Sequence, residues 1–211
     1  MGIVVGLAAE ARIARRLGWK VAIGGGTAVG AEAAARRLID DGSDALVSFG
    51  LAGALDPALR PGALIVPAAV VVDGVCHRAD PDLSHILGGA TVRAVLGGDV
   101  VVASIEEKRR LRDRTSAAAV DLESGAVARV AVAHGLPFAV LRVVCDPADR
   151  ALPPAALVAL STRGCIGIWR VASSLAARPG QLPAVLALAA DAAVARRSLV
   201  ARVRQIARAL A

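Results

Sequence analysis

Residues 119–149 read AVDLESGAVARVAVAHGLPFAVLRVVCDPAD. The first half predicts a helix with Glu123 at its start, and the apolar run Phe138 to Val144, interrupted by Arg142, predicts a buried strand. Asp146 follows this strand almost at once. Ligands of open α/β folds bind outside the carboxyl ends of the strands, so an acid delivered there indicates a catalytic site. Taken alone, Glu123 fits a charge at the start of a helix, and Asp146 with Pro147 fits a turn. The two carboxylates together favour a catalytic site.

The rest of the chain alternates short apolar segments with helical ones. We expect strands at residues 2–6, 19–23, 44–50, 63–66, 69–75 and 100–103, and helices at 9–17, 28–39 and 106–114. This alternation predicts a three-layer αβα fold with a mixed, mainly parallel central sheet. The 211 residues suit a single domain, 1–211, with a helical C-terminal part from about residue 154. Residues 73–98 lack a regular pattern, and we expect them to form a surface excursion from the sheet.

The composition limits the classes of binding partner and the cellular compartment that we expect for the protein. The chain has 25 Lys and Arg against 18 Asp and Glu, a net charge of +7, which favours an anionic partner. Nucleic acid is disfavoured, because there is no Tyr and there are only two Phe and two Trp to stack on bases. Three scattered cysteines fit reduced thiols in a cytoplasmic protein. The Cys, His and Asp residues between 76 and 85 match no metal-binding spacing, and no apolar stretch is long enough to span a membrane.

The C-terminal helix has an apolar stripe between arginines. Leu199, Val203, Ile206 and Leu210 recur every three or four residues. A basic amphipathic helix suits peripheral contact with the inner face of a membrane. The helix has no aromatic anchor, however, which favours packing of the stripe against the sheet instead.

Two segments carry a family resemblance. Residues 48–66, SFGLAGALDPALRPGALIV, resemble the Gly-Ser-Ala-Gly-Gly-Leu and Gly-Asp-Ile-Val-Val signature of the purine nucleoside phosphorylase and nucleosidase superfamily. Residues 119–149 resemble the Met-Glu-Ser-Ala helix and Ile-Ser-Asp strand end of the same superfamily. Within it, the EARIARRLG start and the CDPAD ending are most similar to the hopanoid-associated phosphorylases, which act on adenosylhopane.

The resemblance implies cleavage of the N-glycosidic bond of a purine nucleoside. The expected reaction releases adenine from adenosylhopane to give (phospho)ribosylhopane in hopanoid biosynthesis. One alternative is a methylthioadenosine or adenosylhomocysteine nucleosidase, and another is a catalytically inactive nucleoside-binding protein. The resemblance also implies a homodimer, a nucleoside substrate with an apolar tail, no metal and no organic cofactor, with phosphate as a candidate co-substrate.

The resemblance assigns the reacting groups. Asp146 matches the acid that protonates the purine at nitrogen 7, and Glu10 aligns with the carboxylate that activates the attacking water. Phosphorylases of the superfamily have an Arg in place of Ser48 and a Ser or Thr in place of Leu51, and both contact phosphate. If phosphate is the nucleophile, Arg12 or an arginine of a second subunit has to replace them. Whether phosphate or water attacks is left open.

The resemblance also assigns the substrate-binding groups. Glu123, near Asp121, matches the carboxylate that binds the ribose hydroxyls, and Leu122 takes the place of a Met against the sugar face. Ala52 and Gly53 form a turn of small residues that lets the ribose and base approach the backbone.

Two further expectations come from the residues themselves. A charged Arg142 inside a buried strand needs a partner, so we expect it to pair with Glu123 or Asp121. Residues 164–177, GCIGIWRVASSLAA, are apolar around Trp169, and we expect them to line the groove for the tail.

Overall fold

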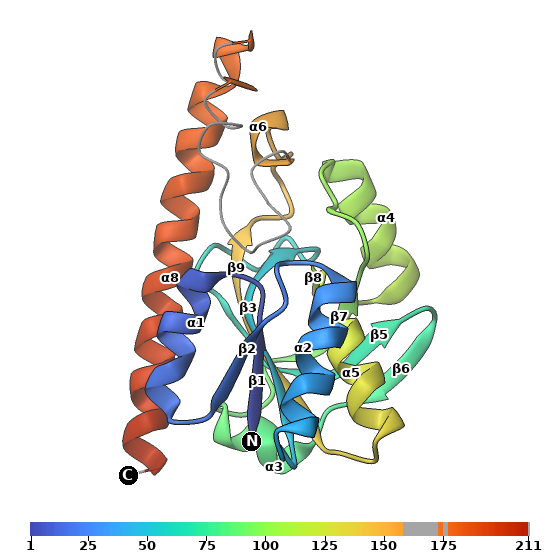
Figure 1. Ribbon diagram of the computed structural model, residues 1–211. Helices are drawn as coiled ribbons and strands as arrows, with labels where there is room; N and C mark the ends of the chain where they lie inside the picture. The colour runs from blue at the N-terminus through green and yellow to red at the C-terminus, as the bar shows by residue number, and fades with distance from the viewer. Residues whose placement is uncertain (158–172, 175–176, 211) are drawn as a thin grey trace.

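The computed structural model describes residues 1–157, 173–174 and 177–210 (Figure 1). Within this part, nine strands form one mixed sheet with the main path β2-β1-β3-β8-β7-β5-β6, and β9 joins β3 and β4. The strands are β1 (Gly2–Val5), β2 (Lys20–Ile23), β3 (Leu46–Ala54), β4 (Leu64–Ile65), β5 (Pro67–Val72), β6 (Val75–Arg78), β7 (Val92–Gly97), β8 (Ala119–Asp121) and β9 (Phe138–Asp146). The helices are α1 (Ala8–Ala14), α2 (Ala28–Asp40), α3 (Pro81–Ile86), α4 (Ile105–Thr115), α5 (Ser124–Ala133), α6 (Pro154–Leu157) and α8 (Leu182–Leu210), with 3-10 turns at Arg15–Leu17 and Pro179–Gln181.

The parallel pair β3 and β9 places the carboxyl ends of two buried strands side by side. Leu46 lies opposite Phe138 at one end of the pair, and Gly53 lies opposite Asp146 at the other. Both strands are buried on both faces almost throughout, which is why their sequences are nearly continuous apolar runs. β8 joins the same edge, because Val120 pairs with Gly53 in the antiparallel sense. The strand ends therefore converge on one opening.

Helices cover both faces of the sheet, which confirms the predicted three-layer αβα fold. Apolar side chains of α2 and α5 pack with β1, β3 and β9 in one core cluster. Those of α1 and α8 pack on the opposite faces of the same strands in a second cluster. Figure 1 shows α1 and α8 together on one side of the sheet and α2 and α5 on the other.

The long helix α8 divides into two parts. Its apolar stripe, which includes Leu199, Val203 and Ile206, is buried against α1 and the sheet, so the predicted packing is confirmed. Leu210 at its end is 48% exposed. The first half extends past the sheet beside α6 (Figure 1). None of the helices in the described ranges is long and apolar enough to cross a membrane.

Three predictions for the middle of the chain differ from the structure. Residues 100–103 are not a strand: Val100 is 69% exposed, and the sheet strand of this region is the preceding β7. Residues 73–98 are not an excursion, because they contain β6, α3 and β7. The strand predicted at 69–75 instead ends at Val72, and Asp73 and Gly74, with φ of 51° and 75°, form the two-residue turn into β6. An Asp-Gly pair with both φ angles positive is a strong hairpin signal.

Truncation of a buried leucine of α8 tests the docking of this helix. Leu199 is 1% exposed, so Leu199→Ala leaves a cavity and should lower the free energy of unfolding by about 2–5 kcal/mol. The matched control is Leu186→Ala on the same helix, where the side chain is 60% exposed and the expected change is within about 0.5 kcal/mol. Urea denaturation of the three proteins measures both values. Equal losses would contradict the division of α8 into a docked and an undocked part.

Candidate active site

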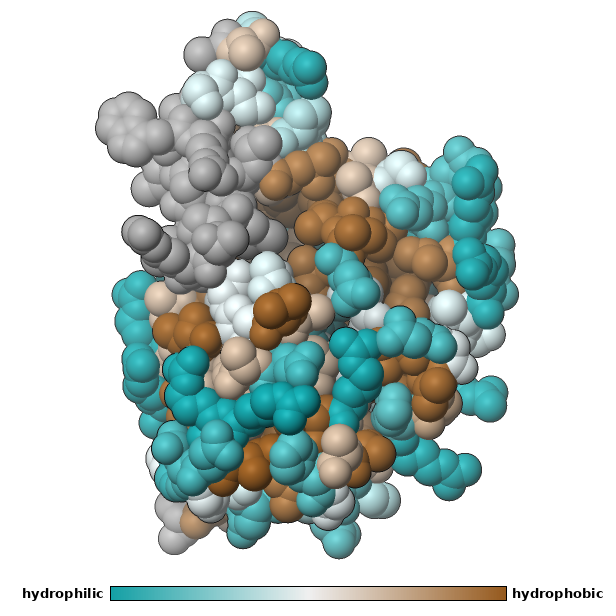
Figure 2. Space-filling view, turned by 45° about the vertical axis from the view of Figure 1, so that its right-hand side comes forward, coloured by the Kyte–Doolittle hydropathy of each residue, from teal (hydrophilic) through white to brown (hydrophobic). Residues whose placement is uncertain are grey.

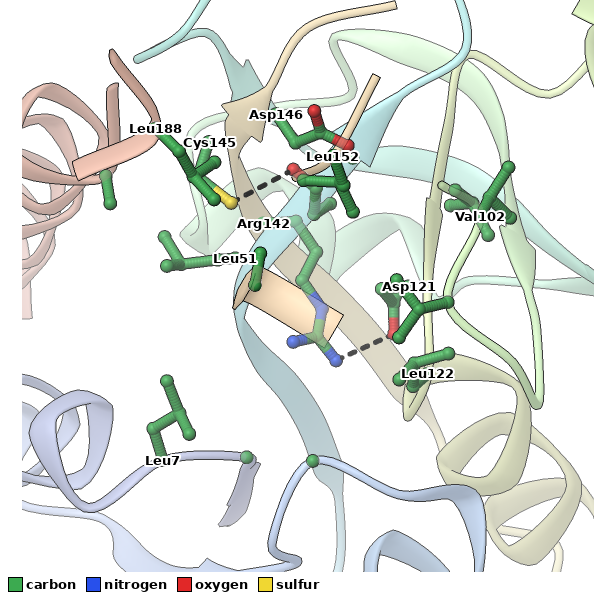
Figure 3. Close-up of a pocket in the computed structure, with 18 of the residues that line it drawn as sticks. Leu7, Leu51, Val102, Asp121, Leu122, Arg142, Cys145, Asp146, Leu152 and Leu188 are labelled. Carbon is green, nitrogen blue, oxygen red and sulfur yellow. Dashed lines mark hydrogen bonds and ion pairs between the residues drawn. The ribbon is translucent and has the colours of Figure 1, made fainter. Parts of the chain in front are cut away.

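A cavity of about 430 Å³ lies at the carboxyl ends of β3, β8 and β9 (Figure 3). Its inner end carries the charged side chains of Glu10, Asp121, Glu123, Arg142 and Asp146. The remaining walls are almost wholly apolar. The structure thus brings together seven of the eight predicted site residues: Glu10, Ala52, Gly53, Asp121, Leu122, Glu123 and Asp146.

Arg142 lies at the centre of the charged end. Its side chain is 1% exposed, and its guanidinium pairs with Glu123 Oε2 at 2.8 Å and with Asp121 Oδ1 at 3.0 Å. It also donates to the Ser48 hydroxyl at 2.6 Å. The predicted pairing is confirmed with both carboxylates rather than one. Figure 3 shows Arg142 rising from β9 toward Asp121.

Glu10 is held in place by backbone amides. Its Oε2 accepts hydrogen bonds from the N–H groups of Gly6 and Leu7 at 3.1 and 2.8 Å, and its Oε1 accepts one from Leu51 at 3.1 Å. The side chain is buried at the start of α1. Burial, together with the nearby Glu123 carboxylate, raises the pKa of Glu10 to about 7. A carboxylate of this kind can take up a proton near neutral pH.

Two carboxylate oxygens at the site lack a hydrogen-bond partner within the described residues: Glu123 Oε1 and Asp121 Oδ2, both buried. The other oxygen of Asp121 accepts from the backbone N–H groups of Glu123 and Ser124 at 2.8 and 2.7 Å, which fixes the start of α5. Burial raises the pKa of Glu123, while Arg142 acts against this rise. A buried acceptor without a donor is costly unless a ligand hydroxyl supplies one.

Asp146 is paired with a lysine that sequence reasoning missed. Lys108 Nζ lies 2.7 Å from Asp146 Oδ2, and the lysine side chain is 1% exposed. Burial raises the pKa of Asp146, and its hydrogen bond and charge interaction with Lys108 oppose that rise. The neighbouring Cys145 thiol donates to the Ala52 carbonyl at 3.6 Å, and burial raises its pKa to about 12. Cys145 is therefore a thiol at neutral pH and no nucleophile.

The charged end depends on a glycine. A Cβ atom at Gly50 would lie 2.6 Å from Glu10 Oε1 and 2.7 Å from Arg142 Nη1, and the φ of Gly50 is +152°. The backbone of β3 therefore passes directly beneath both charged groups. Gly53 has a similar role for the acid, because its Cβ would lie 3.3 Å from Asp146 Oδ2.

Arg12 is the predicted site residue that the structure does not place in the cavity. It is exposed on α1, whereas Glu10, two positions earlier, is buried. Two residues span about 200° of an α-helix, so the two side chains point in nearly opposite directions. Arg12 therefore does not line the cavity of its own subunit, and its contact with phosphate stays a prediction. Positions 48 and 51, where the phosphorylases have their phosphate contacts, do not supply one here. Ser48 is bound to Arg142, and Leu51 lines the cavity with an apolar side chain.

The outer wall of the cavity comes from segments that were not predicted to form it. The contributors share an apolar character and come from the segment after β7, the segment around α6 and the first half of α8: Val100, Val101, Val102, Leu152, Ala155, Ala156, Val185, Leu188, Ala189 and Ala192. Figure 2 shows hydrophobic surface gathered at this end of the molecule, beside the atoms drawn in grey. Residues 164–177, the predicted wall, lie largely outside the described residues.

Within the described ranges, no group of three or more His, Cys, Asp or Glu side chains is placed so that it could hold a metal ion.

The αβα fold and the cleft lined by buried carboxylates fit an enzyme of the nucleoside phosphorylase and nucleosidase class. The model of the Phosphorylase superfamily matches residues 13–163, more than half of the chain, and the protein belongs to this superfamily. No curated protein matches the chain at a significant level.

Solved structures with the same fold include several nucleosidases. The S-adenosylhomocysteine nucleosidase of Streptococcus pyogenes is 20% identical, with 70% of this chain and 83% of that chain covered and a TM-score of 0.63. The 5′-methylthioadenosine/S-adenosylhomocysteine nucleosidase of Helicobacter pylori is 19% identical over 97% of both chains, with a TM-score of 0.66. A futalosine hydrolase mutant of Helicobacter pylori is 20% identical, covers 68% of this chain and 88% of that chain, and has a TM-score of 0.60. At these identities the likeness establishes the fold.

The raised pKa of Glu10 predicts a pH-dependent loss of stability. The folded state keeps the proton of Glu10 up to about pH 7, whereas the unfolded chain loses it near 4.5, so stability falls as the pH rises between these values. Glu10→Gln cannot titrate. The difference in unfolding free energy between Glu10→Gln and the wild type should therefore grow with pH by on the order of 3 kcal/mol and then level off.

Denaturation between pH 4 and 8 measures this difference. The matched control is Glu106→Gln, where the side chain is 71% exposed and the curve should run parallel to that of the wild type. Parallel curves for Glu10→Gln as well would mean that Glu10 does not carry the proton.

Proposed function

We propose that this protein hydrolyses the N-glycosidic bond of an adenine nucleoside that carries an apolar 5′ substituent, with water as the nucleophile. The observation that carries the proposal is that Glu10, Glu123 and Asp146 all line one cavity, so a candidate base, a candidate ribose-binding group and a candidate acid share it. Such cleavage passes through an oxocarbenium-like state, in which the leaving base takes up a proton and the sugar gains positive charge.

Each carboxylate has a distinct part in this reaction. Asp146 protonates the departing adenine, and its burial supports a raised proton affinity. Glu123 binds the ribose hydroxyls through Oε1, the acceptor that has no partner in the described part of the chain. Glu10 takes a proton from the attacking water, for which a pKa of about 7 is suitable.

Water is favoured over phosphate as the nucleophile because the cationic side chains at the cavity, among the described residues, are already paired with carboxylates. Arg142 is the one cationic side chain among the described lining residues, and Asp121 and Glu123 already pair with it. Lys108 behind the wall is paired with Asp146. A phosphate ion would enter a cavity where carboxylates outnumber cations, and burial makes such like-charge repulsion costly.

Two observations bear on the 5′ substituent. The solved nucleosidases of the same fold act, by their names, on methylthioadenosine and adenosylhomocysteine, which supports a small thioether substrate. The apolar outer wall, which residues 100–102, the segment around α6 and the first half of α8 form, supports instead a larger apolar group, as in adenosylhopane. We take methylthioadenosine as the first candidate substrate and adenosylhopane as the second. The homodimer also remains a proposal, and light scattering can test it.

Adenine release tests the reaction. The protein is mixed with methylthioadenosine, and in a parallel tube with adenosylhopane in detergent, each with and without phosphate. We expect release without phosphate, and a loss of about 100-fold or more in kcat for Asp146→Asn with ligand binding retained. Release that requires phosphate would contradict the hydrolytic mechanism, and no release from either nucleoside would favour the inactive binding protein. The more active of the two nucleosides identifies the substituent.

The outer wall can be tested separately. Leu188 lines the cavity, whereas Leu186 on the same helix is 60% exposed and does not. Leu188→Arg should raise KM for adenine nucleosides with long 5′-alkylthio chains by about tenfold or more, because one or two buried methylenes contribute about 1–2 kcal/mol. Leu186→Arg is the matched control and should change KM less than about twofold. If KM changes equally for short and long chains, the wall does not bind the substituent.

A further inference from the structure

The buried ammonium group of Lys108 sits behind the acid. Within the described ranges it is one of the largest fully buried side chains, and it reaches inward from α4, a helix whose other charged residues are exposed. Burial of a lysine is unfavourable unless the charge is paired and each donor is used. The contacts of Lys108 meet both conditions.

Three acceptors surround Lys108 Nζ. Asp146 Oδ2 lies at 2.7 Å, and the carbonyl oxygens of Pro147 and Arg150 each lie at 2.8 Å. An amine bonded to three acceptors has to donate three protons, so Lys108 is an ammonium ion. The same group holds one oxygen of the carboxylate and the turn that follows β9. The side chain and the backbone near the acid are thus fixed to α4 by a single atom.

We propose that Lys108 is the positioning residue of the acid: it holds one oxygen of Asp146, leaves the other for the departing base, and stabilises the carboxylate that remains when the proton has gone. This inference rests on the proposed function. In the step, the Asp146 O–H bond breaks as the purine N–H bond forms, and the electron pair of the glycosidic bond stays with the base. The negative charge then left on Asp146 lies against the ammonium ion. A stabilised product anion makes Asp146 a stronger acid.

Other charged groups near Asp146 are already paired with each other. Arg150 Nη1, from the turn after β9, lies 2.5 Å from Asp191 Oδ2 on α8, and the adjacent Cys145 is a neutral thiol. Lys108 lowers the pKa of Asp146 more than Arg150 does, and Asp191 raises it. Lys108 is therefore the charge whose removal should change the acid most.

Substitution of Lys108 separates positioning of the acid from simple structural support. In Lys108→Met the carboxyl keeps its proton to higher pH but gives it up less readily. We expect kcat for adenine release to fall by about tenfold or more, and the alkaline limb of the pH profile to move up by about 1–3 pH units. KM should change little. Lys108→Arg should restore part of the rate, and the control Arg110→Met, on a side chain 73% exposed, should leave both quantities unchanged.

Two further measurements guard against misfolding of the variant. In the Asp146→Asn background, Lys108→Met should cost nothing more in kcat, because the acid through which it acts is absent. On 4-nitrophenyl β-ribofuranoside, whose phenolate departs without protonation, Lys108→Met should keep most of its activity. Equal loss on both substrates, an additive effect with Asp146→Asn, or an unmoved alkaline limb would overturn the inference. Wild-type protein that releases no adenine would overturn the proposed function and this inference with it.

Discussion

The buried guanidinium of Arg142 constrains most of what surrounds it. Moving a charge out of water costs several kcal/mol, and removal of one member of a buried pair costs about 3–5 kcal/mol. Arg142 recovers this cost through Asp121 and Glu123, which come from the end of β8 and the start of α5. The backbone opposite Arg142 has to be Gly50, because any side chain there would occupy the space of its guanidinium. The register of the central strands and the position of the carboxylates therefore depend on one pairing.

Several features of this centre follow from the sequence by simple physical rules. A nearly continuous apolar run of this length is typical of a strand buried on both faces, and β9 is one. A charge inside such a strand has to be paired, which predicts that Arg142 pairs with a nearby carboxylate, Glu123 or Asp121. The edge of the sheet at which the acids lie follows from the rule for strand ends. These predictions needed only local pattern and the cost of burying charge.

The features that sequence reasoning missed depend on contacts between distant segments. Lys108 belongs to a helix that looks wholly solvated, and its burial arises only because α4 packs over the turn at residues 147–150. The three residues of β8 are too few for a periodic signal. The first half of α8 lines the cavity only because its second half docks on the sheet. Arg12 is a different case, since helical periodicity by itself separates its side chain from that of Glu10.

The charge balance of the cavity links the fold to the choice of nucleophile. In the described residues, the carboxylates Glu10, Asp121, Glu123 and Asp146 face only two cations, Arg142 and Lys108. In the proposed reaction, charged carboxylates beside the sugar favour a transition state in which the sugar becomes cationic, and cations that are already paired offer little to an entering anion. The two cations also have different partners: Arg142 pairs with Asp121 and Glu123, and Lys108 pairs with Asp146. In the proposed reaction, each end of the glycosidic bond would therefore have its own buried ion pair, so a group that loses a proton and a group that gains one could share the cavity.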